Sequence, residues 1–153
     1  MQIRKATHKD AKKISYLIRK NTDQVKENLY TPEQIKVWKN KNTPQKIITD
    51  TLNARTTFVG FQNNKLVGTI GIEGNNLVGF YISYSKRGKG LGGDLLLFVE
   101  AYAKKINLTE LHLTATPSGY GFYLKYGYLP YGKIDLFYDG VKFIETKMKK
   151  VLK

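Results

Sequence analysis

The chain has 153 residues and a net charge of +14, and because it contains no cysteine it has no disulfide, thiolate metal site or cysteine nucleophile. Its hydrophobic content of 41%, with 12% aromatics, excludes a disordered chain, and no apolar run approaches the roughly 20 residues of a membrane span. The start, Met1-Gln-Ile-Arg-Lys, is not a signal peptide, so we expect one cytoplasmic domain over residues 1–153 without a membrane partner.

The front of the chain is predicted to be helical after a short first strand, Gln2–Lys5. Thr7 and Asp10 have the spacing of a capping box, and the residues that follow form an amphipathic helix pattern. Thr31-Pro32 and Thr43-Pro44 each resemble a helix start with proline at the first helical position. We therefore expect three helices before the main run of strands.

Strand patterns begin near Arg55 and are separated by turn residues. Asn63-Asn64 and Gly74-Asn75-Asn76 join consecutive hairpins, so this part of the sheet is predicted to be antiparallel. A later strand is reached through a helical crossover and is expected to run parallel to its predecessor. Asp139-Gly140 joins the last two strands. The expected strands are residues 56–61, 66–72, 77–82, 110–114, 134–138 and 141–148. The fold class is thus α/β with a mixed, mostly antiparallel sheet flanked by helices.

A glycine-rich loop stands between a buried strand and an amphipathic helix that begins near residue 91. Glycines let the backbone approach a ligand closely, and the first turn of a helix offers unpaired N–H groups at the positive end of its dipole. Two basic side chains add charge at the rim. The pattern predicts a diphosphate site made of Arg87, Gly88, Lys89, Gly90, Leu91, Gly92 and Gly93.

Other nucleotide motifs fit this loop less well. A P-loop needs lysine after its last glycine, and here Asp94 follows Gly93. Gly88, Gly90 and Gly93 match the dinucleotide fingerprint, but they follow antiparallel hairpins, which is the wrong context. The basic residues are scattered, with one dense run at residues 147–153, so a nucleic-acid partner is not expected and the charge is interpreted as steering for anions.

Two ordered motifs resemble the GNAT acetyltransferase superfamily. Residues 81–92, Tyr-Ile-Ser-Tyr-Ser-Lys-Arg-Gly-Lys-Gly-Leu-Gly, resemble its acyl-CoA motif, with Arg87, Gly90 and Gly92 at the core positions. Residues 121–128, Gly-Phe-Tyr-Leu-Lys-Tyr-Gly-Tyr, resemble its second signature. The resemblance implies a sheet that splays into an acyl-CoA cleft, acetyl-CoA as co-substrate without a metal, and transfer of its acetyl group to a primary amine in a ternary complex.

The resemblance also implies roles for single residues. Backbone N–H groups of residues 87–93 would bind the diphosphate, and strand residues Phe80, Tyr81 and Ile82 would pair with the pantetheine amides. A backbone N–H near Ile82 would stabilise the oxyanion. Tyr123 would protonate the departing thiolate, since its ordinary pKa near 10 keeps it protonated at neutral pH. On its short helix Tyr123 projects about 100° away from Phe122, which favours a position facing the cleft over core packing.

Two departures from the family pattern leave alternatives open. The strand before the loop has no carboxylate, so the base is Glu73 near the preceding hairpin, or water removes the proton, or the amine arrives neutral. Where the family often has asparagine, this chain has Thr116-Pro117-Ser118. Either Thr116 or Ser118 supplies a hydroxyl to the cofactor, or these residues only cap the next helix.

The acceptor is not specified by the sequence. Tyr16, Tyr30, Trp38 and Tyr138 either line its pocket or belong to the core, and small-molecule and peptide amines both stay open. The basic surface favours neutral or acidic acceptors over polyamines. Exposed C-terminal strands leave a homodimer open. The alternative to an enzyme is a non-catalytic module that senses acyl-CoA or docks to a partner, and its support is the missing strand carboxylate.

Overall fold

The predicted order of helices and strands is present in the computed structural model, which describes residues 1–25 and 29–153. Three helices and one strand come first: β1 (Gln2–Lys5), α1 (Ala11–Thr22), α2 (Pro32–Lys41) and α3 (Pro44–Lys46), which continues into a π-helical segment, Ile47–Leu52. Two hairpins follow, made of β2 (Thr56–Gln62), β3 (Lys65–Glu73) and β4 (Asn76–Ile82). The last elements are α4 (Leu91–Lys105), β5 (Glu110–Ala115), α5 (Tyr120–Lys125), β6 (Leu129–Tyr138) and β7 (Val141–Val151).

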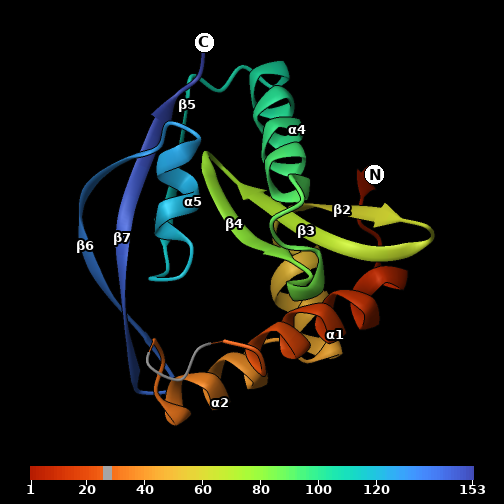
Figure 1. Cartoon of the computed structure of the whole chain (residues 1–153), viewed down its shortest axis with the longest axis vertical. Helices are drawn as coiled ribbons and strands as arrows, with labels where there is room; N and C mark the ends of the chain where they lie inside the picture. The colour runs from red at the N-terminus through yellow and green to blue at the C-terminus, as the bar shows by residue number, and fades with distance from the viewer. Residues whose placement is uncertain (26–28) are drawn as a thin grey trace.

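All seven strands belong to one sheet in the order β1-β2-β3-β4-β5-β7-β6. Neighbouring strands are antiparallel except β4 and β5, which run parallel and are paired at Asn76 and His112. Beyond that pair the two strands diverge, so that β1–β4 and β5–β7 form two halves of the sheet (Figure 1). We call this opening the β4–β5 split. The mixed, mostly antiparallel α/β fold predicted from the sequence is confirmed.

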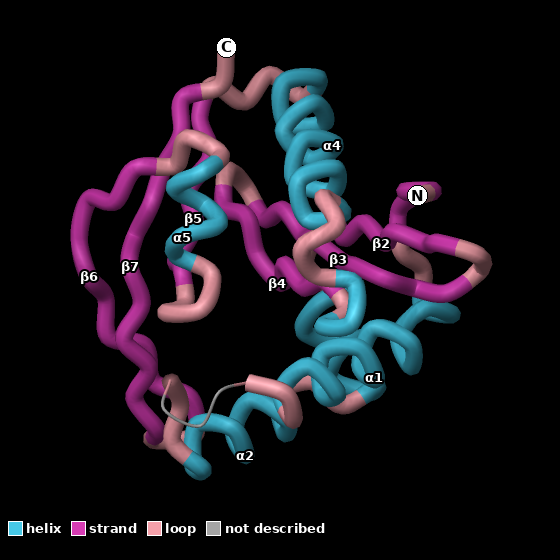
Figure 2. Tube along the Cα trace, viewed as in Figure 1, coloured by secondary structure: helices cyan, strands magenta, loops and turns pink. Residues whose placement is uncertain are grey.

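Helices cover both faces of the first half of the sheet, as Figure 2 shows. Successive strand residues point to opposite faces, and β2 illustrates this, because Phe58 packs with Leu95 and Val99 of α4, whereas Val59 packs with Ile14 of α1. The α4 face also receives α5, and the α1 face also receives the π-helical segment through Ile47. The sheet therefore separates two cores, one under α4 and α5 and one under α1.

Local signals in the sequence account for the helix starts and turns. Thr31 Oγ1 accepts the N–H of Gln34 at 3.1 Å, and the Gln34 side chain returns a bond to the N–H of Thr31 at 2.9 Å. Asn63 and Asn64 both have positive φ in the β2–β3 turn, as Asp139 does in the β6–β7 turn. These turns fall where the sequence placed them.

An irregularity in β4 was not predicted. Thr69 of β3 faces Tyr81, whereas Gly71 faces Val78, so β4 contains one more residue than β3 between these two pairs. Gly79, with φ of +58°, lies in this bulge. The bulge changes the direction of the last residues of β4, which lead into the glycine loop.

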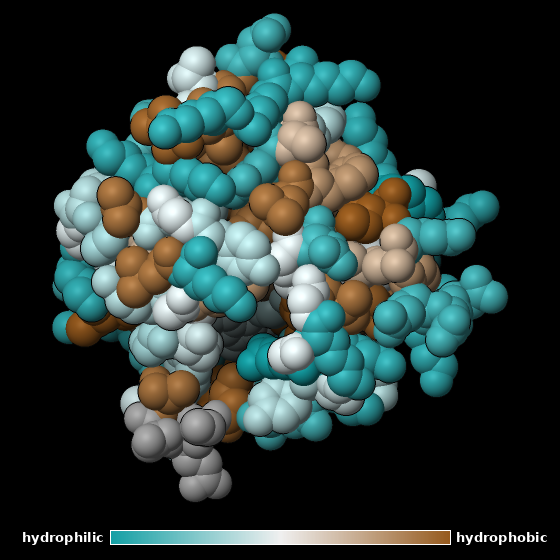
Figure 3. All heavy atoms as spheres, turned by 45° about the horizontal axis from the view of Figure 1, so that its top comes forward, coloured by the Kyte–Doolittle hydropathy of each residue, from teal (hydrophilic) through white to brown (hydrophobic). Residues whose placement is uncertain are grey.

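Hydrophilic residues cover most of the face in Figure 3, with separate hydrophobic patches between them. The C-terminal lysine run lies on β7, where the ammonium groups of Lys147 and Lys149 stand 5.2 and 5.3 Å from the ring centroid of Tyr131. Lys150 pairs with the buried carboxylate of Glu100 at 2.9 Å. Among the described helices, none combines the length and the apolar character that crossing a bilayer requires.

Candidate active site

The glycine loop leads from the end of β4 into the N-terminus of α4. Gly88 and Gly90 have φ of +75° and +81°, a conformation that favours glycine. The Gly90 carbonyl accepts the first helical hydrogen bond, from the N–H of Asp94 at 3.1 Å, so the N–H groups at positions 91–93 have no acceptor within the helix. Gly90 has no side chain that could cap them. This set of donors without helical acceptors, preceded by the exposed Arg87 and Lys89, fits a diphosphate.

Gly92 and Gly93 serve the contact between α4 and α5. A Cβ on Gly92 would lie 3.2 Å from the ring of Phe122, and a Cβ on Gly93 would overlap the phenol of Tyr126. The Phe122 and Tyr126 rings in turn pack on each other, with centroids 4.8 Å apart. The two signature motifs are therefore in direct contact, which the sequence alone did not reveal.

Replacing Gly93 with alanine is expected to destabilise the protein by about 1–3 kcal/mol, because the new methyl group forces the Tyr126 ring and α5 away from α4. For a domain of this size the melting temperature falls by about 2–4 °C for each kcal/mol. Gly121→Ala is the matched control, since a Cβ at this α5 position meets no heavy atom within 4 Å. Thermal unfolding of both variants checks the prediction, and equal melting temperatures would contradict it.

The end of β4 presents backbone groups toward the β4–β5 split. Ser83 donates its N–H to Val67 of β3 at 2.8 Å, and backbone groups alternate in direction along a strand. The N–H and C=O groups of Tyr81 therefore point toward β3, and those of Phe80 and Ile82 point toward the split. Of the three residues expected to pair with pantetheine, Phe80 and Ile82 have this orientation, and Tyr81 instead directs its side chain to the α1 face.

Asn21 at the end of α1 connects β4 to the loop. Its side-chain amide donates to the carbonyl of Ile82 at 2.8 Å, and its carbonyl oxygen accepts the N–H of Tyr84 at 3.0 Å. The residue is buried, with 5% of its surface exposed. Asn21 thus positions the strand end and the loop, and no motif marked it because its partners lie 61 and 63 residues away.

Tyr123 lies on α5 beside the last residues of β4. Its ring centroid is 6.1 Å from that of Phe80, 5.4 Å from Phe122 and 5.9 Å from Tyr128. Burial raises the pKa of the Tyr123 phenol above its ordinary value, and interactions with Tyr81 and Glu145 add to the rise. The phenol therefore holds its proton at neutral pH, as a proton donor in this position must.

The two sequence motifs thus form a glycine loop with N–H donors that have no helical acceptor and a half-buried phenol, both beside the split in the sheet. The model of the "Acetyltransferase (GNAT) domain" family matches residues 26–152, which is most of the sequence. The chain belongs to the GNAT acetyltransferase family. It is accordingly an acetyltransferase domain by family, and the parts described above are those of its candidate active site.

Solved GNAT structures share the fold. A GCN5-related N-acetyltransferase from Rhodopseudomonas palustris is 20% identical and has a TM-score of 0.92, over 99% of this chain and 95% of that chain. PaiA N-acetyltransferase from Thermoplasma acidophilum, in complex with coenzyme A, is 24% identical with a TM-score of 0.78 over 98% of each chain. A phosphinothricin acetyltransferase from Sinorhizobium meliloti, in complex with AcCoA, is 15% identical with a TM-score of 0.75 over 99% and 88%. No curated protein matches the sequence significantly.

Thr116 and Ser118 lie in the loop between β5 and α5 of this GNAT domain. Their hydroxyl oxygens are 3.2 Å apart, and that of Ser118 is 3.1 Å from the hydroxyl of Tyr30. The residue before α5 is Gly119, and no side chain caps the helix there. The capping alternative is thus not what the structure shows, and the two hydroxyls instead bridge this loop to the segment between α1 and α2.

Glu73 lies away from the other site residues. It is the last residue of β3, exposed, and paired with Asn76 at the hairpin that begins β4. The glycine loop and Phe80 lie at the other end of β4. The structure therefore does not bring Glu73 to Tyr123.

The structure also contains a buried carboxylate that sequence reasoning missed, on the strand that pairs with β5. Glu145 of β7 is only 8% exposed and accepts a hydrogen bond from the hydroxyl of Thr114 on β5 at 2.6 Å. Burial is the main cause that raises the pKa of Tyr81, Tyr123 and Tyr138, and the negative charge of Glu145 adds to the rise of each. The sequence signal that could have identified Glu145 is its spacing of two residues from Phe143, which puts a charged side chain on the buried face of the strand.

Three of the four aromatic residues considered for the acceptor pocket come together. Trp38 packs edge-on against Tyr30 and Phe143, with centroids 6.0 and 5.6 Å apart, and Phe143 packs against Tyr138 at 5.5 Å. The indole N–H of Trp38 donates to the hydroxyl of Tyr81 at 2.9 Å. Tyr16, by contrast, is 65% exposed on α1. The cluster lies on the same side of β7 as Glu145.

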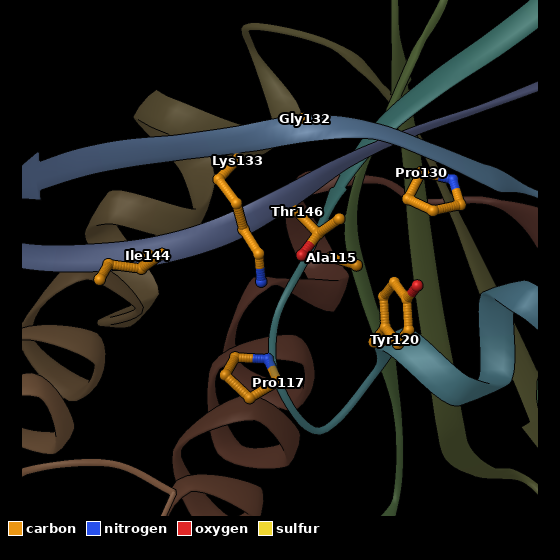
Figure 4. A pocket seen from close by; sticks show the side chains of 8 residues that line it. All are labelled: Ala115, Pro117, Tyr120, Pro130, Gly132, Lys133, Ile144 and Thr146. Atoms are coloured by element: carbon orange, nitrogen blue, oxygen red, sulfur yellow. The ribbon is translucent and has the colours of Figure 1, made fainter.

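A pocket of about 380 Å³ lies on the other side of β7, between the β5–α5 loop and the β6–β7 hairpin (Figure 4). Its lining includes Ala115 and Tyr120 from one wall and Thr146 from the other. The side chain of Lys133 reaches from β6 toward Pro117 across this pocket (Figure 4). Strand alternation separates it from Glu145, because Ile144 and Thr146 point away from the face that carries Glu145.

Metal ligands do not gather in the part of the chain that the structure describes. Within residues 1–25 and 29–153 there is no group of three or more His, Asp or Glu residues placed to hold an ion. His112 of β5 instead contacts Glu110 at 2.8 Å and the hydroxyl of Tyr131 at 3.1 Å.

Proposed function

We propose that this GNAT domain, over residues 1–153, transfers the acetyl group of acetyl-CoA to a primary amine by direct attack in a ternary complex. The proposal is supported by two observations: a helix N-terminus whose first N–H groups have no acceptor within the helix follows β4, the strand that borders the split, and the half-buried phenol of Tyr123 lies beside the same strand. The names of two solved relatives, both N-acetyltransferases, support an amine as the acceptor.

The cofactor would be held mainly by backbone groups. The N–H groups of residues 87–93 would bind the diphosphate. Phe80 would pair with the pantetheine amides through both its backbone groups, and Ile82 through its N–H, since its carbonyl already accepts the Asn21 amide. Thr116 or Ser118 would add a hydroxyl from the opposite side. An N–H in this stretch of β4, near Ile82, would stabilise the oxyanion that forms when the amine attacks.

Tyr123 would complete the transfer. As the carbon–sulfur bond breaks, its hydroxyl gives a proton to the thiolate, and its oxygen then takes the surplus proton from the new amide nitrogen. Because burial raises the pKa of Tyr123, the proton is present at neutral pH. The thiolate is less basic than a phenolate of raised pKa, so the transfer is made favourable by the acidic proton that the phenol oxygen takes from the cationic nitrogen.

The non-catalytic alternative depended on the absence of a carboxylate from the strand before the loop. Glu145 provides a buried carboxylate from β7 that acts electrostatically on Tyr123, so that absence does not count against catalysis. We therefore favour the enzyme over the sensing module.

The purified chain is expected to bind coenzyme A with measurable heat and to release free thiol from acetyl-CoA when a suitable primary amine is added. A colorimetric thiol assay over small amines, amino acids and peptides, with mass spectrometry of the product, tests this. A chain that binds coenzyme A but releases thiol with none of these amines would argue for the sensing module. A chain that gives neither heat nor a thermal shift with coenzyme A would overturn the proposal.

A further inference from the structure

Glu145 occupies a position that is unfavourable for a charge. It shares the inward face of β7 with Phe143, and the residue between them, Ile144, is 50% exposed on the other face. A carboxylate that is 8% exposed loses most of its hydration, which destabilises the ionised form unless partners replace the water. Within the described residues its hydrogen-bond partner is the single hydroxyl of Thr114. The remaining oxygen lone pairs are available to a ligand.

A small recess adjoins this carboxylate. It measures about 30 Å³, room for one or two groups the size of water, and its walls include Glu145, Thr116 and the rings of Tyr30, Trp38 and Phe143. Aromatic faces and a carboxylate both attract a cation, and an ammonium group matches water in size. The recess is therefore suited to a small cationic group such as a primary ammonium group.

The recess and the phenol belong to one site. Tyr81 links them, because its hydroxyl accepts the Trp38 indole N–H at 2.9 Å and its neighbour in β4, Phe80, packs on Tyr123 with ring centroids 6.1 Å apart. Thr116, which lines the recess, belongs to the loop that leads from β5 into α5. The carboxylate thus lies on the α2 side of the β4–β5 split, and Tyr123 lies on the α5 side.

We propose that Glu145 binds the ammonium group of the acceptor and takes its proton, so that the acceptor is a cationic primary amine. This rests on the proposed acetyl transfer. One N–H bond of the ammonium breaks and its proton goes to a Glu145 oxygen, while the freed lone pair forms the C–N bond with the thioester carbonyl. Tyr123 then exchanges protons with sulfur and nitrogen as described, and Glu145 releases its proton to water. The products are the amide and the free thiol.

The groups that face Glu145 set the pH at which it works. Burial raises the pKa of Glu145, while the hydroxyl of Thr114 and the positive charge of Lys41 lower it in part. Arg55 adds positive charge that acts on Lys41, Tyr81 and Tyr138, and the three tyrosines around Glu145 are neutral at physiological pH because their pKa values are raised. Glu145 therefore loses its proton at a higher pH than an ordinary glutamate, and activity should rise with pH as it does so.

Glu145→Gln is expected to lower kcat/KM for the amine by about 100-fold or more and to remove the acidic limb of its pH profile, with KM for acetyl-CoA unchanged. Lys41→Gln should move the acidic limb to higher pH, because it removes a charge that lowers the pKa of Glu145. Glu110→Gln is the control, since Glu110 is an exposed carboxylate on β5 that pairs with His112. An unchanged rate and profile in Glu145→Gln, or the same loss in Glu73→Gln, would overturn the inference.

Loss of activity in Glu145→Gln is not expected to result from a loss of stability. A carboxyl whose pKa is raised in the folded state holds its proton more tightly there than in the unfolded chain, so stability decreases as pH rises above the ordinary glutamate pKa. Glu145→Gln removes that decrease and should melt at a higher temperature than the wild type at pH 8. A variant that is both more stable and less active identifies a functional carboxylate and not a structural one.

A second measurement does not depend on turnover. In carbon NMR of the glutamate-labelled chain, the resonance that Glu145→Gln removes should titrate at higher pH than the other glutamates. Adding n-butylammonium should shift it, whereas n-butanol, the uncharged analogue, should not. A resonance that titrates with the exposed glutamates, or responds equally to both probes, would sink the inference even if no amine is acetylated. An active wild type with these negative results would leave the proposed acetyl transfer intact.

Discussion

Tyr123→Phe is expected to lower kcat by about 10²- to 10⁴-fold, the usual range for loss of a general acid, while the affinity for coenzyme A stays the same. The substitution removes one oxygen and keeps the ring that packs on Phe80, Phe122 and Tyr128. Only the proton for the departing thiolate is lost, so kcat and kcat/KM should fall together. Steady-state kinetics with calorimetric titration of coenzyme A measure both quantities.

Tyr131→Phe serves as its control, because it also removes one phenolic oxygen, at a position on β6 that contacts His112 and is 45% exposed. Its rate should match the wild type. The raised pKa of Tyr123 has a further consequence, since no loss of activity from its ionisation should appear below the ordinary tyrosine pKa. Full activity in Tyr123→Phe would remove the acid role.

Gly90→Asp should weaken coenzyme A binding by roughly 100-fold at low ionic strength. The new carboxylate stands at the N-terminus of α4 where a diphosphate is proposed to bind, and like charges about 4 Å apart repel by about 4 kcal/mol near a protein surface before salt screening. Calorimetric titration with coenzyme A checks this, and the loss should shrink as salt is added.

Gly74→Asp is the matched control for that variant. Gly74 also has a positive φ, +60°, and a Cβ at either glycine meets no heavy atom within 4 Å. Both variants therefore carry the same new charge and similar backbone strain, but Gly74 lies in the β3–β4 turn, at the opposite end of β4 from the loop. Equal weakening in both variants, or wild-type affinity in Gly90→Asp, would refute the diphosphate site.

Much of the scaffold is determined by short stretches of the sequence. Three features specify structure within a few residues, because their hydrogen bonds and backbone angles are local: the capping pair Thr31 and Gln34, the turn at Asn63-Asn64, and Gly127, whose φ of +89° follows the end of α5. Hydrophobic periodicity adds which face of each helix or strand is buried. These signals place the glycine loop and Tyr123 on the correct elements. The family resemblance supplies the functions expected of them.

What the tertiary structure decided is which elements meet. Asn21 forms a hydrogen bond with Ile82, 61 residues away, and Gly93 of α4 contacts Tyr126, which follows α5. Glu145 accepts a hydrogen bond from Thr114 because β7 pairs with β5. Periodicity tells which side of a strand is buried but carries no record of the partner on that side, since packing is non-directional and depends on the sheet order. The role proposed for Glu145 therefore depends on the placement of β5 beside β7 and of α2, which carries Trp38, over the same face.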